Sequence, residues 1–173
     1  MARTRARLPA RARRVVPPGP LIRAAVLVPI VDRGEPVLVF AQRSDHVGQH
    51  AGQISFPGGR IDAGDRDDLH AALREAEEEV GLPPSAVEPL GALDDTETFA
   101  TQFVITPWVG VVRGPVVWRP DGHEIDTVIE VPVAALLARG HADAVGPVTH
   151  SAPTRSRYCL RIRAVAPQIV VPW

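Results

Sequence analysis

Three glutamates near the middle of the chain have the spacing that gathers carboxylates on one face of a helix. Glu75, Glu78 and Glu79 stand at positions i, i+3 and i+4, which are neighbours on a helical surface. Like charges at that spacing repel, yet Arg74 is the only base beside them, and residues 75–112 contain eight acids and no Arg, Lys or His. Clustered carboxylate oxygens suit Mg²⁺ or Mn²⁺. The pattern favours a metal site over the alternative, a solvated acidic helix face.

A pair of glycines lies ahead of this cluster. Gly58 and Gly59 follow the alternating segment 53–56 and precede the acidic helix. Small residues there allow the backbone to approach a ligand closely, and a free carbonyl can supply a further oxygen. We interpret Pro57-Gly58-Gly59 as a sharp turn. A simple turn would explain the glycines but not their place just before an acidic helix.

One strong helix must carry the glutamates. Asp67 or Asp68 can cap its start, and Gly81 followed by two prolines closes its end, so we expect a helix over 67–80. Its apolar residues recur at intervals of three and four and predict one buried stripe: Leu69, Ala72, Leu73, Ala76 and Val80.

The rest of the chain alternates short β-like runs with turn signals. A second short helix is expected after Pro132, through Leu137. Strands on both sides of the strong helix predict an α/β fold in which helices cover both faces of a mixed β-sheet. The expected strands are 24–31, 36–42, 53–56, 87–93, 103–112, 127–131, 158–162 and 168–171.

Composition excludes several classes of protein. The chain has 173 residues, of which 45% are hydrophobic and 23% charged, as in one globular domain rather than a disordered or fibrous protein. No apolar run approaches the roughly 18 to 20 residues of a membrane helix, and no secretory signal is recognisable, so we expect a cytoplasmic protein without a membrane partner. The single cysteine, Cys159, excludes an intramolecular disulfide framework.

The net charge of −1 conceals a division. Residues 1–23 carry seven arginines and no acid, so the remainder carries −8. All 19 basic residues are arginine and asparagine is absent, which indicates a GC-rich genome rather than nucleic-acid binding. We interpret residues 1–20 as a basic, Arg- and Pro-rich, flexible arm before a domain spanning 21–173. A loose electrostatic contact of the arm with an acidic partner or with the protein's own acidic body is the alternative.

The stretch from Gly59 to Leu82 resembles the Nudix box, GX5EX7REUXEEXGU. Arg74-Glu75-Ala76-x-Glu78-Glu79-x-Gly81-Leu82 is intact, whereas the preceding stretch is one residue longer and has Asp62 and Asp65 where one Glu is usual. That longer form is similar to the coenzyme A pyrophosphatase branch. So is the upstream segment 43–56, although Val47 and Gly48 depart from its usual pattern. The resemblance covers about residues 22–138.

The resemblance implies a Nudix α/β/α sandwich that cleaves a nucleoside diphosphate derivative with water and a divalent metal. It implies that Glu75, Glu78, Glu79 and the Gly59 carbonyl bind Mg²⁺ or Mn²⁺. Arg74 would fix the rotamer of a glutamate. Glu75 is the first candidate for the general base, and two acids expected on later loops are the others: Glu97 and Glu124.

The branch resemblance also implies a substrate. Coenzyme A or an acyl derivative would be cut to 3′,5′-ADP and 4′-phosphopantetheine or its acylated form, with Arg43, His50 and Gln53 as candidate contacts. A loop-bracing hydrogen bond is the alternative role of His50. The alternative functions are hydrolysis of another diphosphate, such as ADP-ribose or NADH, and nucleotide sensing with weak catalysis. No nucleic-acid partner is expected, because the acidic body would repel the backbone.

The C-terminal end departs from the family pattern. A helix usually follows the last strand, and the chain stops at Pro172-Trp173, where that helix should begin. We therefore expect the C-terminal helix to be missing. Apolar sheet left exposed would favour association, which makes a homodimer a possible assembly.

Overall fold

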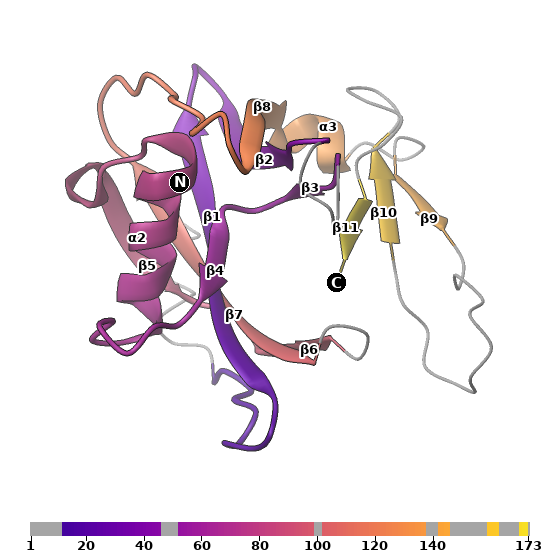
Figure 1. Ribbon diagram of the computed structural model, residues 1–173. Helices are drawn as coiled ribbons and strands as arrows, with labels where there is room; N and C mark the ends of the chain where they lie inside the picture. The colour runs from indigo at the N-terminus through magenta and orange to yellow at the C-terminus, as the bar shows by residue number, and fades with distance from the viewer. Residues whose placement is uncertain are drawn as a thin grey trace.

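Two long parallel strands form the centre of a mixed β-sheet. The computed structural model describes residues 12–45, 52–98 and 102–137, together with the backbone of three short strands nearer the C-terminus (Figure 1). β1 (Ile22–Asp32) and β7 (Phe103–Val112) are paired in register from Ile22 opposite Phe103 to Val31 opposite Val112. Both are rich in β-branched residues, which pack well on a pleated surface.

The other strands extend this pair by antiparallel contacts. The sheet has eight strands in the order β3-β2-β1-β7-β5, with β4 also on β1, β6 on β7 and β8 on β2. The bounds of these strands are β2 (Pro36–Arg43), β3 (Ile54–Ser55), β4 (Gly58–Arg60), β5 (Val87–Ala92), β6 (Thr96–Thr98) and β8 (Ile125–Pro132).

Helix α2 (Asp68–Val80) covers one face of the sheet (Figure 1). It begins where predicted, because the Asp67 side chain accepts a hydrogen bond from the His70 amide at 2.7 Å. It ends at Gly81, which takes the left-handed conformation with φ 70°. Ala71, which the predicted stripe did not contain, is fully buried, whereas the predicted Leu69 and Leu73 are only half-buried. The buried face of α2 is therefore centred on small side chains rather than on the two leucines. A short 3₁₀ turn, η1 (Pro84–Ala86), follows.

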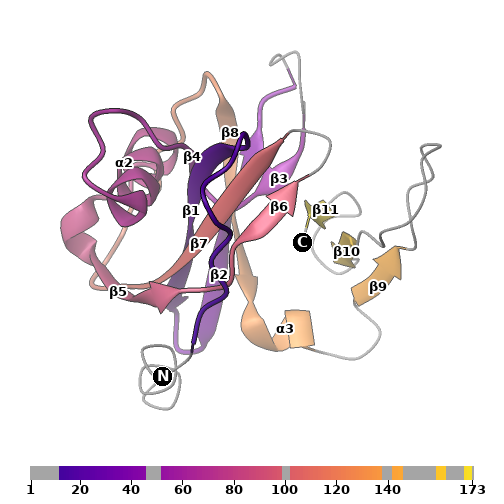
Figure 2. The ribbon, with the colours of Figure 1, turned by 90° about the horizontal axis from the view of Figure 1, so that it is seen from below.

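The opposite face carries the second predicted helix. α3 (Val133–Leu137) places Leu136 against a cluster formed by Phe40, Ile54 and Val131. Helices therefore lie on both faces of a mixed sheet, and the predicted α/β architecture is confirmed. The described segments after α3 are the strands β9 (Ala142–Val145), β10 (Cys159–Ile162) and β11 (Val170–Pro172), which form a separate antiparallel sheet on the side of the main sheet away from α2 (Figure 2).

The interpretation of Pro57-Gly58-Gly59 as a sharp turn was wrong. Gly58–Arg60 is strand β4, and Gly58 and Gly59 lie opposite Val26 and Ala25 of β1. Gly58 has φ 153°, and a Cβ built on it would lie 2.4 Å from the Ala25 carbonyl oxygen and 2.5 Å from the Val26 Cα. Glycine is therefore required by the close approach of two backbones within a sheet rather than by a turn.

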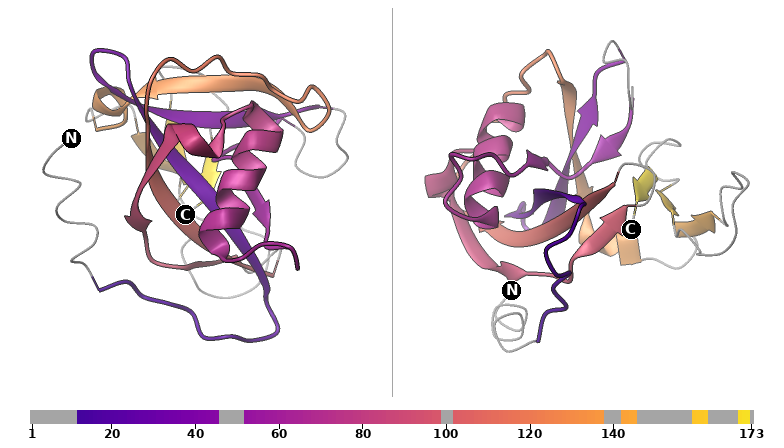
Figure 3. Two further views of the ribbon diagram at one scale, coloured as in Figure 1. Left: turned by 90° about the vertical axis from the view of Figure 1, so that its left-hand side faces the viewer. Right: turned by 60° about the horizontal axis from the view of Figure 1, so that its bottom comes forward.

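The described part of the basic arm is attached to the domain (Figure 3). The carboxylate of Asp95, which is 1% exposed, accepts hydrogen bonds from the Arg13 guanidinium, from the Val16 amide at 2.9 Å and from the Thr106 hydroxyl at 2.8 Å. Arg13 also lies 3.8 Å from Asp68 in the first turn of α2. Contact with the acidic body, the alternative to a free arm, is thus present over residues 13–16, while residues 1–11 lie outside the described part of the chain.

Candidate active site

Glu75 points from α2 toward the glycine strand β4. A Cβ built on Gly59 would lie 2.5 Å from the Glu75 Oε1 and 2.6 Å from its Cδ. The carboxylate of Glu75 thus occupies the space that a side chain at position 59 would fill. It is half-buried, with 19% of the side chain exposed, and burial raises its pKa against the opposing effect of Arg74, 3.0 Å away.

Glu79 is the most deeply buried of the three glutamates. It is 8% exposed, and its Oε2 accepts a hydrogen bond from the Gly58 amide at 3.0 Å. Burial raises its pKa to about 7, even though the Gly58 hydrogen bond opposes the change, and the nearby charge of Glu75 raises it further. Among the described residues no base lies within ion-pair distance of Glu79. The glycine strand and α2 therefore hold two carboxylates that repel one another.

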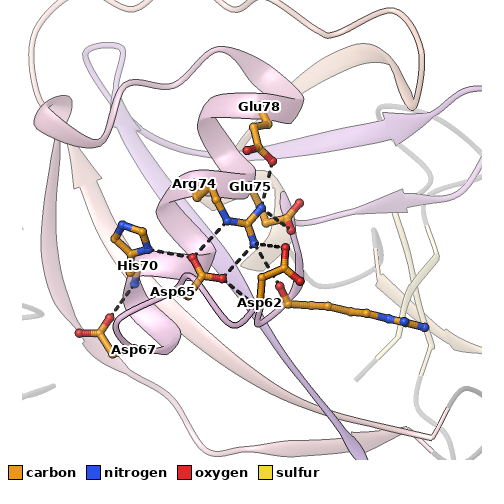
Figure 4. A network of polar contacts seen from close by, with 8 residues as sticks. Asp62, Asp65, Asp67, His70, Arg74, Glu75 and Glu78 are labelled. Carbon is orange, nitrogen blue, oxygen red and sulfur yellow. Dashed lines mark hydrogen bonds and ion pairs between the residues drawn. The ribbon is translucent and has the colours of Figure 1, made fainter.

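Arg74 connects Glu75, Glu78 and Asp65 in one network of polar contacts (Figure 4). Its Nη1 lies 3.0 Å from Glu75 and 3.0 Å from Glu78, whose side chain is 60% exposed. Its Nε and Nη2 donate to both carboxylate oxygens of Asp65 at 3.1 and 3.0 Å, and Nη2 also donates to the Arg60 carbonyl at 3.2 Å. Arg74 thereby fixes the start of the glycine-to-helix loop against the face that carries the glutamates.

Asp65 is the member of this network that sequence reasoning did not assign. Its side chain is 1% exposed and also accepts hydrogen bonds from the Asp62 amide at 2.9 Å and the His70 ring at 2.8 Å. The hydrogen bonds from Arg74 above all hold its pKa well below the usual range. The signal was present in the sequence, since Asp65 lies in the stretch where the box is one residue longer. Asp62 also lies 3.6 Å from Arg74 but is exposed, and spacing alone did not say which of the two would be buried against the arginine.

Three further predicted residues lie on the side of Glu79. Arg43, at the end of β2, donates from Nη2 to the Oε2 of Glu124 at 2.9 Å, and both charges act on the pKa of Glu79. Gln53 faces this end of β2 through its carbonyl, which accepts from the Arg43 amide at 2.9 Å. The structure thus brings Arg43, Gln53 and Glu124 to the C-terminal end of α2.

Glu97 does not join this group. Glu97 lies in β6, opposite Val104 of β7. Three strand spacings of about 4.8 Å each separate β6 from the glycine strand β4, so the fold does not bring Glu97 to the α2 glutamates. His50 lies outside the described residues.

Comparison with known proteins identifies the family. The family model of the NUDIX domain matches residues 21–151, and the chain belongs to this family. The uncharacterized Nudix hydrolase NudL of Salmonella paratyphi B (strain ATCC BAA-1250 / SPB7) is 45% identical over 117 residues, which is 68% of this chain and 60% of that protein. The NudL of Salmonella newport (strain SL254) matches to the same extent. The match therefore spans less than two thirds of the length of these relatives.

Solved structures show the same fold. A NUDIX hydrolase from Alicyclobacillus acidocaldarius has a TM-score of 0.56 at 22% identity and covers 68% of this chain and 81% of its own. An Ap4A hydrolase of C. elegans, in a binary complex, has a TM-score of 0.55 at 20% identity, with coverage of 65% and 81%. At these identities the likeness concerns the fold alone.

None of the helices that the structure describes is long and apolar enough to cross a membrane.

The donor chemistry around α2 fits a divalent cation. Glu75 and Glu79 approach the backbone of Gly58 and Gly59, and carboxylate and carbonyl oxygens are the ligands that Mg²⁺ and Mn²⁺ prefer. In the described residues no three acidic, His or Cys side chains already face one another as a finished metal site, since Glu75 and Glu78 are turned to Arg74. Mutual repulsion of Glu75 and Glu79 is the electrostatic condition that a cation relieves.

The Gly59 carbonyl belongs to the β-ladder. The Leu27 amide donates to the Pro57 carbonyl and the Ile61 amide donates to the Arg23 carbonyl, so both pairs are hydrogen-bonded pairs of the antiparallel β1–β4 contact. Hydrogen-bonded and non-hydrogen-bonded pairs alternate along such a contact, so Ala25 and Gly59, midway between them, also form a hydrogen-bonded pair. A carbonyl oxygen has two lone pairs, so a contribution of Gly59 to a metal would use the one that the ladder leaves.

Proposed function

We propose that the chain is a metal-dependent Nudix diphosphatase that hydrolyses a nucleoside diphosphate derivative. The observation that carries this proposal is the convergence of Glu75 and Glu79 on the glycine strand, where Arg74 is the base that pairs with Glu75 among the described residues. Glu75, Glu78, Glu79 and the Gly59 carbonyl would hold the metal. A bound divalent cation supplies neutralisation of the diphosphate charge and a more acidic bound water.

The residues around the glutamates have supporting roles in this proposal. Arg74 is anchored by Asp65 and holds Glu75 and Glu78 on one face of α2, so it orients the carboxylates rather than contacting the diphosphate. Arg43 would bind a phosphate oxygen, because a guanidinium makes charge-assisted hydrogen bonds to phosphate. Gln53, which directly precedes β3, and His50 remain proposed substrate contacts.

Glu75 remains our first candidate for the general base. Its pKa is raised by burial, and a base whose pKa lies closer to neutrality is a better acceptor of a proton from water. Glu124 carries an ion pair with Arg43, which suits it to orient that guanidinium as well as to act as a loop base. Glu97, three strands from the glycine strand, is the weakest of the three candidates.

Coenzyme A or an acyl derivative is the substrate that we propose. The support is the longer glycine-to-helix stretch and the segment 43–56, both similar to the coenzyme A pyrophosphatase branch. Cleavage of the diphosphate would give 3′,5′-ADP and 4′-phosphopantetheine or its acylated form. Hydrolysis of ADP-ribose or NADH is the alternative activity.

A substrate panel tests both levels of the proposal. The purified chain is incubated with coenzyme A, ADP-ribose, NADH and dinucleoside polyphosphates with Mg²⁺ or Mn²⁺, and the products are separated by chromatography. Turnover of coenzyme A supports the substrate, whereas turnover of another diphosphate alone would reject it and retain the diphosphatase. Failure of every substrate with both metals would refute the activity.

Substitution of the glutamates tests the assignment of the site. We expect Glu78→Gln and Glu79→Gln each to lower turnover by several orders of magnitude while the protein still folds, because each removes a charge from the metal site. Glu77→Gln is the matched control, since Glu77 lies on the same helix with its side chain exposed. Near-wild-type, metal-dependent turnover in both the Glu78 and the Glu79 variants would refute the assignment of these residues to the metal site.

A further inference from the structure

The segment between β7 and β8 is bonded to the C-terminal end of α2. The Arg119 amide donates to the Val80 carbonyl at 2.9 Å, and the Asp121 amide donates to the Glu79 carbonyl at 3.2 Å. A Cβ built on Gly81 would lie 2.8 Å from the Arg119 Cβ, so the helix end and this segment are in close contact. These bonds use carbonyls that the last turn of a helix leaves free. The position of Asp121 is therefore set by the backbone of Glu79.

The side chain of Asp121 closes the turn that leads into β8. Its Oδ1 accepts hydrogen bonds from the amides of His123 at 3.1 Å, Glu124 at 3.0 Å and Ile125 at 2.8 Å. The Gly122 amide completes the turn by donating to the Ile125 carbonyl at 3.0 Å. A side-chain oxygen that accepts from the following backbone amides fixes a turn in the same way as at a helix start. One carboxylate oxygen thus organises the backbone of residues 123–125.

This turn places Glu124 against the end of β2. The Glu124 carbonyl accepts from the Ser44 amide at 2.8 Å, and its Oε2 accepts from the Arg43 guanidinium at 2.9 Å. Arg43 stands opposite Ile125 at an irregularity in the pairing of β2 with β8. Its Nε is buried without a hydrogen-bond partner among the described residues. The direction of the Arg43 guanidinium consequently depends on Glu124 to a large degree.

We propose that Asp121 is a positioning residue for substrate binding, which acts through Glu124 on Arg43. It connects the backbone of Glu79 to the Arg43–Glu124 ion pair, and so keeps the phosphate-binding guanidinium at a constant place relative to the acidic helix. The required property is a hydrogen-bond acceptor at Oδ1, not a negative charge. This inference rests on the proposed diphosphatase function, because a role in substrate binding requires a substrate.

Two variants separate the acceptor from the charge. Asp121→Ala removes the acceptor, whereas Asp121→Asn keeps a carbonyl oxygen that can accept the same three amides. With the diphosphate that the wild-type protein hydrolyses, we expect Asp121→Ala to raise KM roughly tenfold with kcat changed less than about twofold. Asp121→Asn should stay close to wild type. Asp126→Ala, which removes the same charge from an exposed position of β8, is the control.

A double variant tests the route of the effect. If Asp121 acts through Glu124, then Asp121→Ala combined with Glu124→Gln raises KM no further than Glu124→Gln alone. The Nε–Hε signal of Arg43 in ¹⁵N NMR gives a readout without substrate, and it should shift in Asp121→Ala but not in Asp121→Asn.

The outcomes distinguish this inference from the proposed function. Additive effects on KM, equal impairment of Asp121→Asn and Asp121→Ala, a fall in kcat alone, or an unchanged Arg43 signal in Asp121→Ala would each overturn the positioning role. A wild-type protein that hydrolyses no diphosphate would refute the proposed function and the link to substrate binding. In that case the Arg43 signal would still show whether Asp121 orders the ion pair.

Discussion

The two adjacent glycines of β4 should respond in opposite ways to the same substitution. In Gly58→Ala, the new Cβ would meet the Ala25 carbonyl oxygen at 2.4 Å and the Val26 Cα at 2.5 Å, at a φ of 153°. Both contacts are with the backbone of β1, so they are relieved only if β4 separates from β1. In Gly59→Ala, the nearest atoms are the carboxylate atoms of Glu75 at 2.5 to 2.8 Å. These belong to the end of a flexible side chain that can move away.

The contacts set the magnitudes. For Gly58→Ala, overpacking costs about 1 to 3 kcal/mol, and an unfavourable φ adds about 1 to 3 kcal/mol. Against a typical stability of about 5 to 15 kcal/mol, that loss lowers the Tm by roughly 2 to 4 °C per kcal/mol. For Gly59→Ala, moving Glu75 weakens a partly exposed ion pair with Arg74, worth about 1 kcal/mol or less. A glycine replaced by alanine without backbone strain regains about 0.4 to 1 kcal/mol through the unfolded state.

The effects on activity should run the other way. Displacement of the Glu75 carboxylate by about 1 Å is expected to lower kcat of Gly59→Ala roughly 100-fold, with a Tm near that of wild type. The assay is thermal melting by circular dichroism together with steady-state kinetics on the diphosphate hydrolysed by the wild type. If Gly58→Ala melted at the same temperature as Gly59→Ala, the close contact of β4 with β1 would not be what requires glycine at position 58. If Gly59→Ala retained full kcat, the position of Glu75 would not matter for the reaction.

Two further predictions concern buried carboxylates. The pKa of Glu79 is raised by burial from 4.5 to about 7, so as the pH rises the unfolded chain loses this proton before the folded chain does. The free energy of unfolding of the metal-free protein therefore falls between these pH values, by up to about 3 kcal/mol. We expect Glu79→Gln in EDTA to have a higher Tm than wild type at pH 8 and a similar one at pH 4, and equal Tm values at pH 8 would contradict this. Asp95→Asn should cost about 2 to 3 kcal/mol at pH 7 in urea unfolding, because the ion pair with Arg13 loses its buried negative charge and the Val16 amide faces an NH2 group in place of an acceptor. Asp94→Asn should cost less than about 1 kcal/mol. Burial opposes ionisation of Asp95, but its hydrogen bonds outweigh burial and lower its pKa. The stability that ionised Asp95 contributes is therefore complete above the unfolded pKa of 3.8 and is lost as the pH falls through the lower folded pKa. Equal losses of stability in the Asp95 and Asp94 variants at pH 7 would exclude this account.

Local signals in the sequence were sufficient for the helix that carries the site. The cap at Asp67, the stop at Gly81 and the acids between them are all read within one segment, and the structure has the helix at Asp68–Val80. The glycine pair shows where local reading ends. Gly58 and Gly59 have the composition of a turn, but their conformation is imposed by β1, which lies more than 30 residues earlier in the chain. A glycine in the sequence does not indicate whether it is needed for a turn or for a close contact between two strands.

Charge compensation was the feature least visible in the sequence. The run of acids without a base over 75–112 suggested that the whole stretch lacks partners, but in the fold Glu88 pairs with Arg113, and Asp95 is bonded to Arg13 about 80 residues away. The excess of negative charge that favours a cation therefore lies on the helix and does not extend over the whole stretch.

On the helix, acids outnumber the base that contacts them. Arg74 is the arginine within reach of this face among the described residues, and it is shared between four carboxylates, those of Asp62, Asp65, Glu75 and Glu78. One positive charge cannot neutralise four carboxylates, and Glu79 lies buried beside them with a backbone amide as its donor. The excess of negative charge is thus a property of five side chains around Arg74 and the glycine strand. A divalent cation, which prefers oxygen ligands, would relieve such an excess in the proposed diphosphatase.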